Sequence, residues 1–212
     1  GSITISAGSI SGNTALQIED GTVSITGGTI TGQKFGICAD SSYSGTVTIT
    51  GGTIVKTADS DYRGAVTCYG GEILITGGSI SGETTDLVSS LPDGKITLGL
   101  AEDGTGPVFP GGISLYHDEE LNAYLDEGLV YWKNNNPIPV KAGQTELTGG
   151  DVTVKAECKH ENVTYSAEGT TDTQHKQVCP CGYELTEDHS TEKDENQATC
   201  TDQAVCDICG ES

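Results

Sequence analysis

A twelve-residue pattern, Gly-x-Ile/Val-x-Ile-x-x-Gly-x-Ile-x-x, recurs four times near the start of the chain and limits what it can fold into. The copies begin 20, 24 and 26 residues apart, a spacing typical of solenoids. Inside each copy, apolar residues alternate with Ser and Thr, which is the period of a half-buried β-strand. The four copies are residues 1–12, 21–32, 45–56 and 71–82.

A third short apolar segment follows three of the copies, at residues 15–18, 35–39 and 64–68. Three strands per turn predict a mainly β fold, a right-handed parallel β-helix (solenoid) whose coils are spaced about 4.8 Å apart. Equivalent residues then form inward columns. The predicted columns are Ile3, Val23, Val47 and Ile73; Ile5, Ile25, Ile49 and Ile75; and Ile10, Ile30, Ile54 and Ile80.

This stacking explains how a chain poor in apolar residues can fold. Ile, Leu, Val and Phe make up 43 of 212 residues, about 20%, close to the composition of disordered acidic chains. A narrow tube needs few apolar residues per coil, because each one packs on its equivalents above and below. The net charge of -21 makes nucleic acid and anionic lipid poor partners, and no apolar run is long enough to insert into a membrane.

The outward positions form ladders of hydroxyl groups. We interpret these ladders as soluble outer faces, with binding to a repetitive surface such as glycan or ice as the alternative. The two predicted ladders are Ser6, Thr26, Thr50 and Thr76; and Ser9, Thr29, Thr53 and Ser79.

After the coils of residues 1–90, residues 91–156 are expected to hold the last coils and a small α/β cap. We predict one short helix over residues 118–127, capped by Asp118, and strands near 129–132, 138–140 and 151–154. Trp132 is expected to pack inside the cap, and stacking on a sugar is its alternative role.

Residues 157–212 form a different region, with only five large aliphatic residues but six of the eight cysteines and three of the four histidines. So few apolar residues cannot supply a core, so we predict a small zinc-ribbon-like module with about two structural zinc sites. One site is expected to be His189, Cys200, Cys206 and Cys209. The other is expected to be Cys158, His160, Cys179 and Cys181, with His175 competing with His160.

Disulfides are the alternative use of these cysteines, because the protein is expected to be exported. Histidines at matching positions favour zinc, since disulfides have no use for them. Either role is structural, because a Cys3His site leaves no open position for water. Cys38 and Cys68, in the coil region, are expected to be buried thiols, with a disulfide between neighbouring coils as the alternative.

The repeats, together with tail elements such as Ala198-Thr-Cys200 and Cys206-x-x-Cys209-Gly210, resemble large secreted surface proteins of Gram-positive gut bacteria. Those proteins carry right-handed β-helix or carbohydrate-binding-domain repeats and C-terminal Cys/His repeats. The resemblance implies a secreted or cell-surface location, and a monomeric fragment of a larger chain.

Three functions follow as hypotheses. The favoured one is a non-catalytic stalk, adhesin or glycan-binding module with a glycan or another host or cell-surface ligand. The second is a β-helix polysaccharide lyase or hydrolase, for which the loop of Asp59, Asp61 and Arg63 offers the best candidate residues. The third is ice or surface binding through the hydroxyl ladders.

Overall fold

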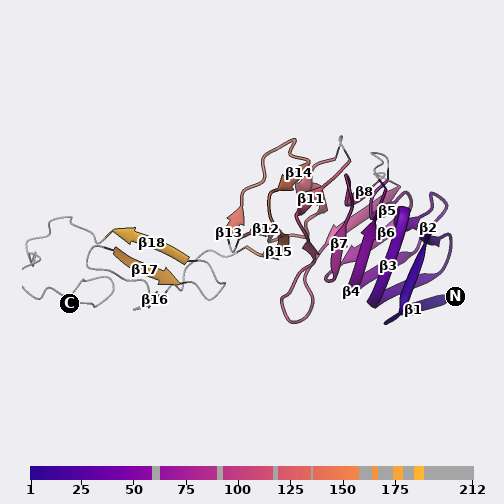
Figure 1. Cartoon of the computed structure of the whole chain (residues 1–212), viewed down its shortest axis with the longest axis horizontal. Helices are drawn as coiled ribbons and strands as arrows, with labels where there is room; N and C mark the ends of the chain where they lie inside the picture. The colour runs from indigo at the N-terminus through magenta and orange to yellow at the C-terminus, as the bar shows by residue number, and fades with distance from the viewer. Residues whose placement is uncertain are drawn as a thin grey trace, which may run out of the picture. The chain divides into compact units, whose positions relative to one another are not determined.

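The computed structural model describes residues 1–58, 63–89, 93–116, 119–134, 136–157, 164–166, 174–178 and 184–188. The chain divides into two compact units, Gly1–Glu157 and Cys158–Ser212 (Figure 1). In both units the described secondary structure is almost entirely β-strand. Among the described residues, no helix has the length and hydropathy needed to cross a membrane.

The first unit is a β-solenoid of stacked parallel strands, as the repeat predicts. Each turn contributes strands to three faces, and strands of successive turns pair in parallel. The first face holds β1 (Ser2–Ile5), the start of β3 (Thr22–Ala39), the start of β4 (Thr46–Lys56), β6 (Gly71–Ile75) and β9 (Gly94–Leu98). The second holds the start of β2 (Ser9–Ile18), the middle of β3, the end of β4, β7 (Ser79–Ser81) and β10 (Val108–Phe109). The third holds the ends of β2 and β3, β5 (Val66–Cys68) and β8 (Leu87–Ser89).

The three predicted inward columns are confirmed by the strand register. Partners run from Ile3 through Val23, Val47 and Ile73 to Ile96, so the first column extends one coil beyond the repeats. The second column likewise extends to Leu98, and the third runs from Ile10 to Ile80. In the middle coils these side chains are almost fully buried, which gives the tube a continuous aliphatic core.

Glycines make the corner between the first and second faces. Gly28, Gly52 and Gly78 have φ of 84°, 90° and 86°, a left-handed conformation that other residues adopt only at a cost. A Cβ atom on Gly52 would lie 3.0 Å from the carbonyl oxygen of Gly28 in the coil beneath. The corner therefore requires glycine both for its dihedral angle and for close stacking of coils.

The two ends of the solenoid differ. At the first coil, Ile3 is 56% exposed, although its column partner Val23 is 2% exposed. At the other end, Leu121 and Tyr124 are buried, and the Tyr131 hydroxyl donates a hydrogen bond to the Leu121 carbonyl at 2.9 Å. The cap thus covers the apolar interior at one end of the stack.

The helix predicted over residues 118–127 is wrong. The described part contains a single 3-10 turn, η1 (Leu121–Tyr124), whose preceding residue Glu120 makes no side-chain capping bond. Leu125 is extended and forms a parallel bridge with Leu98 of β9. Pairing with the last coil therefore ends the turn before a second one can form, and Asp118 lies outside the described residues.

The cap is a β-structure. Trp132 is 1% exposed and packs within it, as expected. Strands near 129–132 and 151–154 form as predicted, whereas the strand expected at 138–140 lies slightly earlier. An antiparallel sheet contains β12 (Leu129–Lys133), β13 (Asn136–Ile138) and β15 (Val152–Ala156), and a smaller one pairs β11 (Gly112–Ser114) with β14 (Glu146–Thr148).

The second unit contains a three-stranded antiparallel sheet among its described residues. The middle strand pairs with both neighbours. The strands are β16 (Thr164–Ser166), β17 (Gln174–Val178) and β18 (Glu184–Asp188).

Candidate functional site

One of the two predicted hydroxyl ladders is continuous across the second face. Ser9 is the register partner of Thr29, Thr29 of Thr53, and Thr53 of Ser79. The first three of these side chains are exposed, and Ser79 is half-buried. Parallel strands about 4.8 Å apart thus present a rigid, evenly spaced row of hydroxyl groups to solvent, which we call the second-face row.

The other predicted ladder is wrong as a continuous row. The register shifts after Ile25, so Thr26 pairs with Gly51 and not with Thr50. The glycine corner begins here, and the extra curvature displaces one strand relative to the next. Ser6, Thr26, Thr50 and Thr76 therefore lie along a bent edge between two faces.

The first face carries a row that the sequence analysis missed. Thr4, Ser24 and Thr48 are register partners, but the row continues with Leu74 before Thr97. The alternation of apolar and polar residues within each repeat could have predicted this row. Its members lie between two inward-facing residues of the same strand, so they face outward. The apolar Leu74 interrupts the hydroxyls of this row, whereas the second-face row has a hydroxyl in each of the four repeats.

On the third face, the outward residues are buried beyond the first coil. Cys38, Thr67 and Val88 are register partners there and are between 0% and 7% exposed. The buried Thr67 hydroxyl accepts a hydrogen bond from the Gly64 amide at 3.0 Å. This face is therefore closed to an extended ligand along much of its length.

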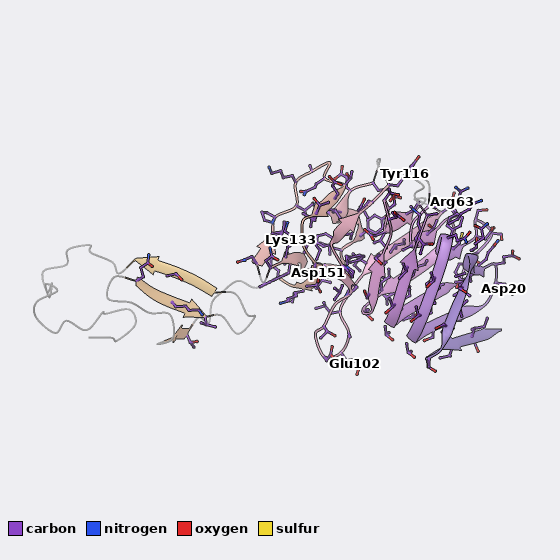
Figure 2. All side chains as sticks on the ribbon, in the orientation of Figure 1. Asp20, Arg63, Glu102, Tyr116, Lys133 and Asp151 are labelled. Atoms are coloured by element: carbon purple, nitrogen blue, oxygen red, sulfur yellow. The ribbon has the colours of Figure 1, made fainter. Side chains whose placement is uncertain are left out.

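An aromatic cluster with an arginine lies on the same side of the solenoid. The rings of Phe35 and Tyr69 meet edge to face with centroids 6.4 Å apart, and the Arg63 guanidinium carbon is 5.4 Å from the Phe35 centroid. The cation–π contact holds Arg63 against the coil. Figure 2 shows Arg63 at the edge of the solenoid.

Of the predicted catalytic loop, Arg63 is described, whereas Asp59 and Asp61 lie outside the described residues. Asp40, in the preceding inter-coil loop, accepts hydrogen bonds from the Ser42 amide and hydroxyl at 3.1 and 3.2 Å. These bonds keep the pKa of Asp40 below its ordinary value. Asp40 therefore has the properties of an ionised turn residue, not of a general acid.

A buried carboxylate, Asp86, was missed by the sequence analysis. Its Oδ1 accepts a hydrogen bond from the Gly82 amide at 2.6 Å, and its Oδ2 accepts one from the Ser114 amide at 2.7 Å. Burial raises the pKa of Asp86 to about 6, although both amides and the charge of Lys56 act in the opposite direction. Asp86 thus joins the corner of one coil to the next coil.

Two further charged groups lie nearby in the fold, the buried Lys56 and the half-buried Glu119. Lys56 is 2% exposed, and its ammonium donates to the Thr84 hydroxyl at 3.3 Å. Glu119 accepts hydrogen bonds from the Ser89 amide and the Tyr124 hydroxyl, both at 2.6 Å, and burial raises the pKa of its carboxyl group. Donors engage both oxygens of Asp86 and of Glu119, which indicates structural roles between coils and cap. A single sequence offers no periodic signal for such acids, because each lies in a loop.

The two coil cysteines are free and buried. Burial raises the pKa of both Cys38 and Cys68 to about 11, and the Cys68 thiol donates to the Gly70 carbonyl at 3.3 Å. A thiol that stays protonated is a poor nucleophile and a poor metal ligand. These residues therefore act as small packing groups.

The predicted zinc ligands fall almost entirely outside the described residues. His175 lies in β17, opposite Glu187 of β18. Within the described part of the chain, no group of three or more His, Cys, Asp or Glu side chains is arranged to hold a metal. The ligands outside it are Cys158, His160, Cys179, Cys181, His189, Cys200, Cys206 and Cys209.

Among the described residues, the second-face row repeats one chemical group, a hydroxyl, in all four copies of the repeat. A hydroxyl group both donates and accepts hydrogen bonds, so such a row matches a ligand that also carries hydroxyl groups at regular intervals. No protein-family model, curated protein or solved structure matches the chain.

Proposed function

We propose that the chain is a non-catalytic, glycan-binding module of a secreted or cell-surface bacterial protein, and that its stack is a right-handed β-helix. The observation that carries this proposal is the second-face row, in which Ser9, Thr29, Thr53 and Ser79 follow one another strand by strand. Crossover connections between parallel strands of one sheet are almost always right-handed.

The charge of the chain favours a neutral glycan as the ligand. A net charge of -21 repels polyanions, so an acidic polysaccharide would bind against an unfavourable field. Polar hydroxyls on a rigid frame lose little conformational entropy on binding, because the strands hold them in place before the ligand arrives.

Structural use of the acids supports a non-catalytic role. Hydrolysis or elimination requires carboxylates that can reach a substrate and exchange protons with it. Asp86 and Glu119 instead accept hydrogen bonds within the fold on both oxygens, and Asp40 is held by its own turn. These groups stabilise the coil connections on which the binding face depends.

A glycan array combined with depolymerisation assays tests the proposal. Thr29→Val with Thr53→Val removes two hydroxyls and keeps the β-branched shape, so binding is expected to fall about tenfold or more, because each neutral hydrogen bond is worth about 0.5–1.5 kcal/mol. The matched control is Thr22→Val with Thr46→Val, two exposed outward positions of the first face. Product release that Asp61→Ala abolishes would show an enzyme and refute the non-catalytic role.

For the tail we propose structural zinc, on the basis of its Cys and His spacing. A closed Cys3His set supplies folding energy and no catalytic water. Metal analysis of the purified chain is expected to find about two zinc ions, and a chelator is expected to remove them together with the ordered structure of the tail. Three disulfides within the tail, found by intact-mass measurement, would contradict this proposal.

A further inference from the structure

The second-face row continues beyond the solenoid into the cap. Ser79 of β7 is the register partner of Val108 in β10, Val108 is the partner of Thr153 in β15, and Thr153 is the partner of Trp132 in β12. Directly opposed residues on neighbouring strands point to the same side of a sheet. The row from Ser9 to Trp132 therefore crosses seven strands, a span of about 29 Å at 4.8 Å per strand.

A hollow lies at the cap end of this row. Its volume is 310 Å³, at the lower end of the range for ligand pockets, and it suits a group the size of one sugar ring. Val108, Trp132 and Thr153 line it from the row itself, and Asn134, Asp151 and Lys155 line it from adjacent positions. In Figure 2, Asp151 and Lys133 mark this part of the cap.

One of the residues that line the hollow, Trp132, has an unsatisfied donor. Trp132 is 1% exposed, and its indole Nε1 is buried with no acceptor among the atoms that the structure describes. A buried donor without an acceptor is unfavourable, and Trp usually has a partner when it is buried. A ligand oxygen that reaches this N–H would remove that penalty.

The walls combine apolar and polar groups. Val108 is 37% exposed at the mouth, which is unusual in a unit whose other large apolar side chains are mostly buried. The Lys155 ammonium lies 4.4 Å from the centroid of the Trp132 ring, on a flexible side chain that can move aside or donate to a ligand. Asn134 has a φ of 53°, so its backbone is in the left-handed region beside the hollow.

The remaining polar groups are fixed in position by the fold. The Thr153 hydroxyl donates to the Pro107 carbonyl at 2.9 Å and retains lone pairs that accept hydrogen bonds. Asp151 Oδ1 accepts a hydrogen bond from the Gly111 amide at 2.9 Å, which holds the carboxylate at the rim. The lining thus combines an indole N–H, the apolar side chain of Val108 and further donors and acceptors, the mixture that a hydroxylated ring requires.

We propose that this hollow binds one ring of a neutral glycan, and that the following rings of the same chain lie along the second-face row toward Ser9. The inference rests on the proposed glycan-binding function and adds the site that fixes one end of the ligand. It assigns Trp132 and Lys155 to ring binding, and Val108 to the apolar contact at the mouth.

Trp132 is the only tryptophan of the chain, so its fluorescence reports this site alone. The probes are cellohexaose, xylohexaose and mannohexaose as neutral glycans and hexagalacturonate as an acidic one. We expect at least one neutral hexasaccharide to change the emission in a saturable way, with the same affinity by calorimetry, and hexagalacturonate to have no effect.

Val108→Arg fills the mouth of the hollow from an exposed position and is expected to weaken binding at least tenfold. Its matched control is Leu74→Arg, an outward aliphatic residue of the first face, which is expected to bind like the wild type. Circular dichroism checks that both variants fold. If Val108→Arg does not fold, Trp132→Phe provides the second test, with binding measured by calorimetry.

The outcomes separate the two proposals. Calorimetric binding of a neutral hexasaccharide without a change in emission, or binding that is unaffected by Val108→Arg and by Trp132→Phe, overturns the hollow and leaves the glycan-binding function standing. If hexagalacturonate is the only probe that binds, the proposal that the ligand is a neutral glycan is refuted. No binding of any probe by either method overturns both proposals.

Discussion

The buried carboxyl group of Asp86 should make the stability of the solenoid depend on pH in an unusual direction. Acids paired with donors commonly stabilise a fold as pH rises, because their pKa falls on folding. For Asp86 the pKa rises from 3.8 to about 6, since burial outweighs the two amide donors and the charge of Lys56. The folded state therefore binds the Asp86 proton more tightly than the unfolded state does.

The magnitude follows from the two pKa values. A tenfold difference in proton affinity is worth 1.36 kcal/mol, so the rise from 3.8 to about 6 corresponds to about 3 kcal/mol. This contribution to the free energy of unfolding is fully present below about pH 4 and is lost as pH rises through about 6. Above that range the ionised carboxylate remains buried, and the contribution of Asp86 is constant.

The other acids of a chain with net charge -21 also titrate below pH 7, so the contribution of Asp86 has to be isolated by difference. Asp86→Asn keeps the shape and removes the titration, at a pH-independent cost from leaving one amide donor without a good acceptor. Urea unfolding of both proteins at pH 4, 5, 6 and 7 can be followed by the fluorescence of buried Trp132. Relative to the variant, the wild type is expected to lose about 2 kcal/mol between pH 4 and pH 7, the part of the total of about 3 kcal/mol that lies in this range.

A difference between wild type and Asp86→Asn that is independent of pH would refute this reasoning. A difference that grows in favour of the wild type as pH rises would refute it more strongly, because it would mean that the amides and Lys56 outweigh burial. Either result would show that burial does not raise the pKa of Asp86 above its ordinary value.

Three further predictions concern the coils. Lys56→Met removes the charge that lowers the pKa of Asp86, so the midpoint of the same pH dependence should move upward. An unchanged midpoint would show that the charge of Lys56 does not affect the pKa of Asp86. Gly52→Ala should lower the free energy of unfolding by about 1–3 kcal/mol, and Gly104→Ala, with a similar φ of 78° but open space around it, by less; equal losses would exclude a steric contribution. Cys38 and Cys68 should react with iodoacetamide at pH 8 only on unfolding, as peptide mass mapping would show, and rapid labelling of the folded chain would contradict their raised pKa.

The coil interior was predictable because its information is local and repeated. Each copy of the repeat places isoleucine or valine at the same offsets, so the partners of Ile3 or Ile10 follow from alignment of the copies alone. A period-2 pattern also fixes which side chains point inward, since a shift of one residue would turn the whole set outward. The same logic failed at Thr26, where the corner glycines change the register by one residue between adjacent coils.

The cap was less predictable because tertiary contacts decide its structure. The spacing of Leu121, Tyr124 and Leu125 matches a helix, yet Leu125 is extended and bridged to Leu98 of the last coil. The short strand β10 consists of two residues, too few for any periodic signal. Asp86 and Lys56 lie far apart in sequence, and nothing local indicates that both become buried.

The position of β10 explains why the second face, and not the first, can carry an extended ligand. The described register on the first face ends where Leu98 meets Leu125, which packs against the apolar core. On the second face, β10 pairs in parallel with β7 and antiparallel with β15, so the sheet passes from solenoid to cap without a break. Because this change of strand direction preserves the outward side of the sheet, Val108 and Trp132 extend the row that begins at Ser9. The cap therefore both closes the apolar core and adds an aromatic end to a row that the repeats alone would leave purely polar.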